Sequence, residues 1–225
     1  MNPYLITGPA QIGVSGGRTS GQMLRKILDA HGGKLPADVH AFFQNTGKES
    51  EKTLVFIDRI DKRWNVGIVW MEWCRVYGQP DDAPWYKLVN FETASRNGEP
   101  FTMMLEYYAA YRKDVKNLPP VLPNFSNNMC TAYLKVKIGE KHMRALGYDE
   151  WDCVVGIRYD EPKRYHRMMA ANARAAHDGT TFAPLTPQAS RRRTSRSSGM
   201  PSRSIWAWIQ TSETATCAGR KAKES

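Results

Sequence analysis

Apolar and polar positions in the first third of the chain alternate in a way that predicts strands and helices in turn. An apolar run at 12–14 predicts the end of a short buried strand, and apolar residues at helical spacing over 21–28 predict a helix. A second strand is predicted over 37–43, an amphipathic helix over 50–64 and a third strand over 66–73. Strand–helix alternation at this spacing indicates parallel strands joined by crossover helices. We therefore expect an α/β domain built on a parallel sheet.

The rest of the chain continues the pattern less regularly. Residues 77–100 contain Pro, Gly and Asp and are expected to form a loop anchored by aromatic side chains. Beyond that loop the pattern predicts helices over 101–111 and 131–146, a strand over 152–157, a charged loop over 158–164, a helix to about residue 176 and a short strand over 182–185.

Composition is typical of a soluble globular protein, at 225 residues and 41% hydrophobic content. The longest apolar stretch, over 66–74, is interrupted by Glu72 and is too short to span a bilayer. No charged-then-apolar leader opens the chain, and the four cysteines form no Cys-x-x-Cys pair, which favours a reducing compartment. We expect a cytoplasmic protein without a membrane partner.

The net charge of +10 is concentrated near the C-terminal end. Residues 190–225 hold eight Lys and Arg against two Asp and Glu, whereas the first 189 residues hold 24 against 20. From residue 186 onward the apolar positions lose any period among Ser, Thr and Arg, which predicts disorder. The expected organisation is one domain over 1–185 and a basic low-complexity tail over 186–225.

The turn between the first strand and the first helix has the chemistry of an anion-binding site. Its two glycines would let the main chain approach a phosphate, its hydroxyl groups offer donors, and its arginine offers a charge-assisted contact. A strand, a glycine turn and a helix also aim backbone N–H groups and the positive helix end at an anion. The alternative is an ordinary tight turn capped by Ser or Thr. The turn consists of Ser15, Gly16, Gly17, Arg18, Thr19 and Ser20.

Three further polar clusters follow predicted strands or begin predicted helices. Ligands of parallel α/β sheets bind at the carboxyl ends of the strands, so together these clusters indicate one site. Taken singly, they could be a helix cap, an inert buried thiol and a solvated helix start. Cys130 is the candidate nucleophile, because a helix start and a nearby ammonium favour its thiolate. The clusters are Thr46, Gly47 and Glu49; Cys130 and Lys135; and Arg158, Glu161 and Arg164.

Five motifs occur in the order seen in the phosphoadenosine phosphosulfate reductase family: SGGRTS, FQNTGKE, TASRNGEPF, CTAYLK and GIRYDEPKR. Over residues 10–185 the chain resembles this family, which belongs to the PP-loop, or adenine nucleotide alpha-hydrolase-like, superfamily. The resemblance implies a flavodoxin-like, HUP-type parallel sheet with helices on both faces. It also implies an enzyme that binds ATP or phosphoadenosine phosphosulfate and acts at the phosphate or sulfate end.

The resemblance also assigns roles to individual residues. The glycine turn over 15–20 matches the phosphate loop, and Thr46, Gly47 and Glu49 match an element near the adenosine. Arg158, Glu161 and Arg164 match an arginine motif that closes over the phosphates. For catalysis we single out Cys130, Lys135 and Arg158.

Two departures from the family pattern leave the reaction open. Thr19 stands where many ATP-cleaving members carry Asp, so no metal site is predicted. The C-terminal Glu-Cys-Gly-Leu-His-like segment of sulfonucleotide reductases is absent, and Cys217 matches it poorly. The hypotheses are sulfonucleotide reduction with a thiol reductant, ATP-dependent adenylation or sulfur transfer onto a nucleic-acid acceptor, and an inactive nucleotide-binding relic. One cysteine cannot hold an iron–sulfur cluster, so none is expected here.

A shifted reading frame would explain the unusual tail. In the shifted frame, each codon from Gln188 onward consists of the last base of one present codon and the first two bases of the next codon. This frame can encode an amphipathic helix and a late Cys-x-x-Cys, as family members have. We predict a one-base loss or gain near 186–187. The alternative is a genuine basic tail, which would suit a nucleic-acid-binding module. Sequencing the gene decides, because a stop codon or no cysteine pair in the other frame excludes the shift.

Overall fold

The computed structural model describes residues 2–124, 127–157, 161–163, 166 and 170. The predicted strand over 182–185, the tail and Cys217 lie outside these residues, as does most of the helix predicted up to residue 176. The described helices include none long and apolar enough to cross a membrane.

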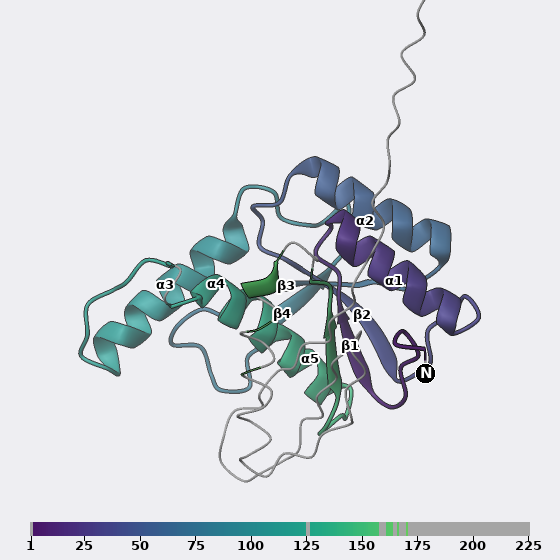
Figure 1. The fold of residues 1–225 in the computed structure, drawn as a ribbon. Coiled ribbons are helices and arrows are strands. Elements are labelled where there is room, and N and C mark those ends of the chain that lie inside the picture. Colours follow the sequence, from purple (N-terminus) through teal and green to yellow (C-terminus); the bar gives the residue numbers. More distant parts are fainter. Residues whose placement is uncertain (1, 125–126, 158–160, 164–165, 167–169, 171–225) are drawn as a thin grey trace, which may run out of the picture.

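The described strands form one five-stranded sheet in the order β4-β3-β2-β1-β5 (Figure 1). β1 pairs in parallel with β2 and β5, and β2 pairs in parallel with β3, which confirms the predicted parallel α/β sheet. β4 runs antiparallel to β3 inside the segment that was expected to be a loop, so that expectation was wrong for four residues. The strands are β1 (Ala10–Gly13), β2 (Val39–Asn45), β3 (Val69–Trp73), β4 (Tyr86–Val89) and β5 (Asp152–Val155).

Helices cover both faces of the sheet (Figure 1). On one face lie α1 (Arg18–Ala30) and α2 (Glu51–Trp64). On the other lie α3 (Glu99–Asp114) and one continuous helical stretch, 129–145, made of α4 (Met129–Thr131), the π-helix η1 (Ala132–Lys137) and α5 (Ile138–Ala145). The predicted helices are thus confirmed within the described chain, with ends that shift by a few residues.

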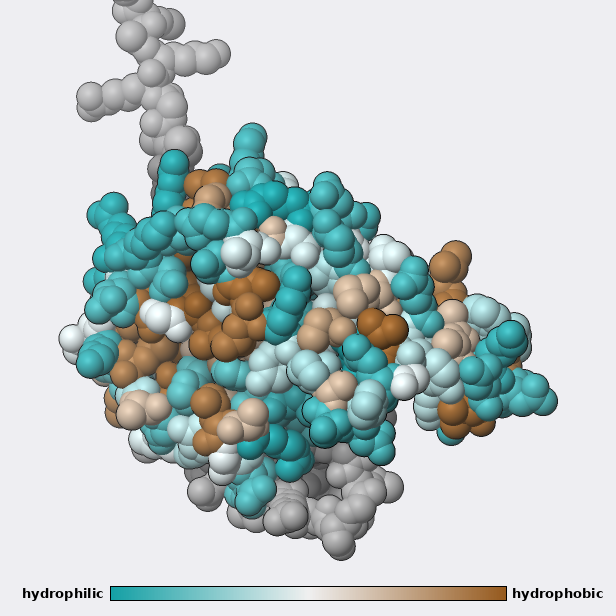
Figure 2. Space-filling model, turned by 180° about the vertical axis from the view of Figure 1, so that it is seen from behind, coloured by the Kyte–Doolittle hydropathy of each residue, from teal (hydrophilic) through white to brown (hydrophobic). Residues whose placement is uncertain are grey.

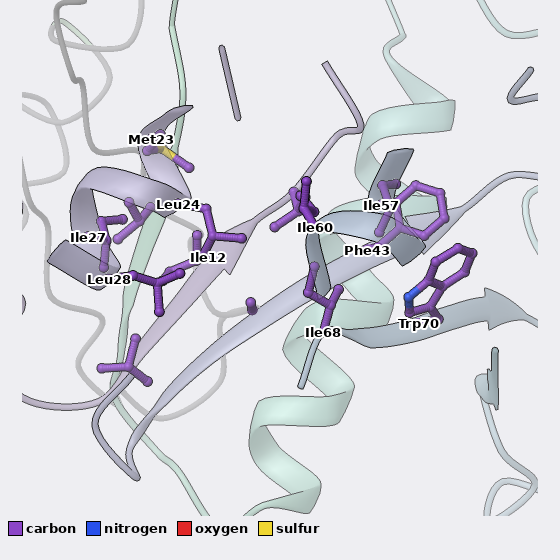
Figure 3. Close-up of a cluster of buried hydrophobic side chains, with 14 of the residues drawn as sticks. Ile12, Met23, Leu24, Ile27, Leu28, Phe43, Ile57, Ile60, Ile68 and Trp70 are labelled. Atoms are coloured by element: carbon purple, nitrogen blue, oxygen red, sulfur yellow. The ribbon is translucent and has the colours of Figure 1, made fainter. Parts of the chain in front are cut away.

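Each face of the sheet has its own apolar core because successive strand side chains point to opposite sides. Phe43 packs with the buried side chains of α1 and α2, whereas its neighbour Phe42 packs with those of α3 and the helical stretch 129–145. Figure 3 shows the first core, where Met23, Leu24 and Ile27 of α1 approach Ile12 of β1. These residues recur at helical spacing, which is why the sequence pattern located α1 correctly.

The chain changes direction across the sheet between β1 and β5. From β1 it moves outward to β2 and β3, and it then returns past β1 to place β5 on the far side. The order β3-β2-β1-β5 corresponds to the 3-2-1-4 part of a Rossmann-like sheet, whereas a flavodoxin-like order would place β1 between β2 and β3. In open α/β sheets ligands bind outside the carboxyl ends of the strands at such a switch point.

Seen from behind, an arm projects from the body of the molecule, and apolar side chains lie among polar ones on it (Figure 2). The segment after α3 leaves Val115, Leu118 and Leu122 exposed. These residues lie far along the chain from the polar clusters that follow β1 and β2.

Candidate functional site

The glycine turn after β1 is held by the hydroxyl group of Ser20. Ser20 is buried, and its Oγ donates to the carbonyl oxygen of Gly17 at 2.9 Å and accepts from the backbone N–H of Ser15 at 3.2 Å. Gly16 has φ of +72°, and a Cβ there would overlap with Thr53 on α2. Ser20 and Gly16 therefore fix the shape of the turn, which the sequence assigned to ligand binding.

The N-terminus of α1 lacks a counter-charge from its own helix. Gly17 is the N-cap and offers no side-chain hydrogen bond, and the first turn of α1 contains no acidic residue. The first N–H groups of a helix have no intrahelical partners and carry partial positive charge. Arg18 and Gly17 are both exposed, so this end of α1 is available to an anion.

A cavity of about 350 Å³ lies beside this turn. It extends between the sheet and the helical stretch 129–145, and it reaches the ends of the two strands that flank the switch point, β1 and β5. Most of its lining is apolar or backbone, with a few polar side chains, which is the usual character of a small-molecule site. The polar side chains that line it are Gln11, Ser15, Ser20, Gln44, Thr131, Lys135 and Glu140.

Lys135 is the predicted catalytic residue that the structure brings to the cavity. It lies in the π-helix η1, whose wider turn interrupts the regular spacing of the stretch 129–145. Glu140 also lines the cavity, and its Oε1 pairs with Nε of Arg144 at 3.3 Å. The cavity therefore contains a lysine ammonium group together with a carboxylate already partly neutralised by an arginine.

Cys130 occupies a different position from Lys135. It is half-buried at the start of the helical stretch, against the core beneath α3, and it is not among the residues that line the cavity. The cysteine that lines the cavity is Cys153 of β5, which is 6% exposed. Sequence reasoning placed Cys153 in a strand and gave it no role in the site.

The loop after β2 is closed by hydrogen bonds among its own residues. The carboxylate of Glu49 accepts from the backbone N–H and the hydroxyl group of Thr46, each at 3.0 Å. Gly47 has φ of +74°, and a Cβ there would lie 2.9 Å from Cα of Gly98. Thr46, Gly47 and Glu49 lie outside the cavity lining, and the structure shows them stabilising this loop.

Glu72 joins that loop to the 93–98 segment, and the sequence reasoning missed it as a structural centre. Its side chain is fully buried and accepts from Nδ2 of Asn45 at 2.6 Å and from the backbone N–H and Oγ of Ser95 at 2.6 and 2.8 Å. Nζ of Lys87 lies 3.2 Å from its Oε2. The signal was visible, because one acidic residue interrupts an otherwise apolar strand.

Gln11 and Gln44 are also cavity residues that the sequence reasoning missed. Gln44 is 7% exposed on β2, and the side chain of Gln11 on β1 lies against Gly139 of α5. A glutamine inside a buried strand is unusual and could have marked both positions.

The predicted arginine motif lies mostly outside the described residues. Arg158 and Arg164 lie outside the described residues, and Glu161, six residues beyond the end of β5, is half-buried. Among the described residues no group of three His, Cys, Asp or Glu side chains is placed to hold a metal ion.

Comparison with known proteins gives one weak similarity. No protein-family model matches the chain, and no solved structure matches it. The chain is 28% identical over 159 residues to the uncharacterized nin region protein ORF290 of Escherichia phage lambda. The match covers 68% of this chain and 49% of the phage protein, so the chain spans about half the length of the curated relative it matches.

Proposed function

We propose that the chain is an adenine nucleotide-binding enzyme of the phosphoadenosine phosphosulfate reductase type, with the HUP-type variant of the Rossmann-like sheet. The observation that carries this proposal is the cavity at the switch point between β1 and β5, bordered by the glycine turn. The phosphate or phosphosulfate end of the nucleotide would lie at the uncapped N-terminus of α1.

The same arrangement would serve both reactions that the sequence left open. Attack on the sulfur of a phosphosulfate and attack on the α-phosphorus of ATP both build negative charge on oxygen atoms. Lys135 would stabilise that charge from η1, and the backbone N–H groups after Gly17 would do so from α1. Thr131 and Ser15 would add hydroxyl donors at the cavity wall.

Isothermal titration with phosphoadenosine phosphosulfate, ATP and adenosine tests this proposal. We expect binding of at least one phosphorylated ligand and a loss of at least about tenfold in its affinity in Lys135→Gln, because a charge-assisted contact contributes roughly 1.5–3 kcal/mol. Adenosine binding should change little. No binding of either phosphorylated ligand to folded protein would refute the proposal. Turnover assays with the ligand that binds then distinguish reduction from adenylation.

A further inference from the structure

Three cations converge on the indole ring of Trp85, and neither they nor the ring are among the residues that line the candidate cavity. Nζ of Lys137 lies 3.8 Å from the ring centroid, Cζ of Arg75 lies 5.1 Å from it and Nζ of Lys141 lies 5.4 Å from it. Arg75 follows β3, Trp85 precedes β4, and both lysines lie on the helical stretch. Two separate segments of the chain therefore bring like charges to a ring supplied by a third.

Arg75 is a buried cation with incomplete hydrogen bonding. Its residue is 4% exposed, and its two terminal nitrogens donate to the carbonyl oxygens of Ala83 and Gln79 at 2.6 and 3.1 Å. Its Nε is buried and has no hydrogen-bond partner among the described residues. A buried guanidinium is normally balanced by a carboxylate, and among the described residues no carboxylate pairs with Arg75.

Within the described chain no carboxylate forms an ion pair with Arg75, Lys137 or Lys141. Glu140 is near enough to favour the charged form of Lys137, but it is paired with Arg144. Burial lowers the pKa of Lys137, and the charges of Lys141 and Arg75 lower it further. The cations repel one another, and within the part of the chain that the structure describes no carboxylate forms an ion pair with them.

Aromatic rings border this cluster and favour a nucleic-acid ligand over an acidic peptide. The ring of Tyr107 lies 5.7 Å from that of Trp85 and 5.9 Å from that of Tyr77, and all three side chains are partly exposed. Cations that neutralise a sugar–phosphate backbone beside aromatic rings that accept bases are the usual combination in proteins that bind single strands.

We propose that Arg75, Lys137 and Lys141 around Trp85 form a second anion site, which binds the phosphodiester backbone of a single-stranded nucleic acid. This inference goes beyond the nucleotide cavity and does not depend on it. Lys137 and Lys141 make the phosphate contacts, and Arg75 adds positive charge from beneath them. Because the same helical stretch also lines the cavity, a bound strand would lie next to the proposed reaction site.

Fluorescence anisotropy with a labelled oligothymidylate of about 20 nucleotides, in the absence of ATP, tests the site on the full chain. Each phosphate contact to a single strand adds about 0.7 to the slope of log affinity against log salt. We expect Lys137→Gln/Lys141→Gln to reduce that slope by about 1.4 and to weaken binding at least about tenfold at low salt. The variant Lys137→Arg/Lys141→Arg, which keeps both charges, should retain binding.

Matched controls separate this cluster from the overall positive charge. Lys34→Gln/Lys62→Gln removes two exposed lysines elsewhere and should leave the slope close to that of the wild type. An equal loss in both glutamine variants would overturn the proposal, as would an unchanged slope in the Lys137/Lys141 variant. Displacement of the oligonucleotide by polyglutamate at equal charge concentration would identify an acidic protein as the partner and overturn it too.

A second measurement protects the test against a variant that fails to fold. In the wild-type chain the oligonucleotide should slow acetylation of Lys137 and Lys141 more than that of Lys34 and Lys62, as mapped by mass spectrometry. Equal rates with and without the oligonucleotide would refute the site. The variant Gly17→Asp should keep oligonucleotide binding, so failure of the nucleotide proposal and failure of this one can be told apart.

Discussion

Nδ2 of Asn45 donates a 2.6 Å hydrogen bond to Oε1 of Glu72, and both side chains are fully buried. This contact joins the carboxyl ends of β2 and β3, and the same carboxylate holds the backbone of Ser95. A buried carboxylate that serves several donors stabilises the fold only while every donor keeps its partner. Glu72 therefore controls the geometry of the loop that follows β2.

Glu72→Gln should lower the free energy of unfolding by about 2–4 kcal/mol. The new amide NH₂ group cannot accept the hydrogen bonds that Asn45 and Ser95 now donate to the carboxylate. Lys87 would also lose its ion pair. Chemical denaturation monitored by circular dichroism measures the change. Glu51→Gln is the matched control, since Glu51 pairs with Arg96 at the surface, and its effect should be far smaller. Equal effects would show that Glu72 is not the centre of this network.

Gly17→Asp should abolish binding of the phosphorylated nucleotide and leave the melting temperature close to that of the wild type. Gly17 has φ of −82°, and a Cβ there would meet no atom closer than Ser15 Oγ at 3.7 Å, so the fold tolerates a side chain. The added carboxylate would repel a phosphate at the N-terminus of α1.

Gly16→Ala provides the structural contrast to Gly17→Asp. At φ of +72°, and with Thr53 in the way, an alanine should lower the melting temperature. Titration calorimetry and thermal melts of both variants check the pair of predictions. Undiminished nucleotide affinity in folded Gly17→Asp would show that the turn does not bind phosphate.

Cys130 should be alkylated first among the cysteines of the described chain. Burial raises the pKa of the Cys74 thiol, and Cys153 is 6% exposed, whereas Cys130 is half-buried near a helix start. Bound nucleotide should slow the reaction of Cys153, which lines the cavity, more than that of Cys130, which does not. Iodoacetamide labelling followed by peptide mass spectrometry gives the order. Faster labelling of Cys74 or Cys153 would remove Cys130 as the candidate nucleophile.

The chain should lose stability as the pH falls below about 6.5, the ordinary range of a histidine pKa. Burial lowers the pKa of His40 and of His142, whose pKa is lowered further by the charge of His40. A lowered pKa in the folded state means that the unfolded chain binds more protons below that pH. Stability is therefore fully present above the unfolded pKa and declines as the pH falls toward the folded values.

Calorimetric melts between about pH 5 and 7.5 test this pH dependence, since that window lies above the ordinary pKa values of carboxyl groups. Nδ1 of His142 and the hydroxyl group of Tyr86 are 2.9 Å apart, so His142→Gln keeps a polar partner there while removing the titration. This variant should show a flatter dependence of melting temperature on pH. A dependence as steep as that of the wild type would exclude His142 as a source.

The helices and parallel strands could be predicted because their apolar residues recur with the period of each element, as Leu24 and Ile27 do in α1. β4 could not, because it is a four-residue edge strand whose Lys87 and Leu88 are exposed and whose position depends on pairing with β3. Long-range contacts of this kind leave no local period in the sequence.

The residues of the site were predicted in part, because only some of them can be recognised from their neighbours in the sequence. Local chemistry at a strand end pointed to Ser15 and Ser20, and local chemistry at a helix start pointed to Lys135; all three line the cavity. Thr46 and Glu49 also have suitable chemistry, but their hydrogen bonds to each other can be seen only in three dimensions. Cys153 was overlooked because its sequence neighbours in the strand are mostly apolar and include no polar motif that would mark the thiol as a site residue.

The π-helical turn over Ala132–Lys137 sets the angular relation between the two ends of its helix. Each residue added to a helix rotates every later side chain by about 100° about the axis. A π-helical turn absorbs one such extra residue, so a single deletion within it would restore regular α-helical winding and leave Thr131 and Lys141 on their present sides of the helix. The extra residue therefore lets this stretch present Lys135 to the cavity without rotating the basic face away from Trp85.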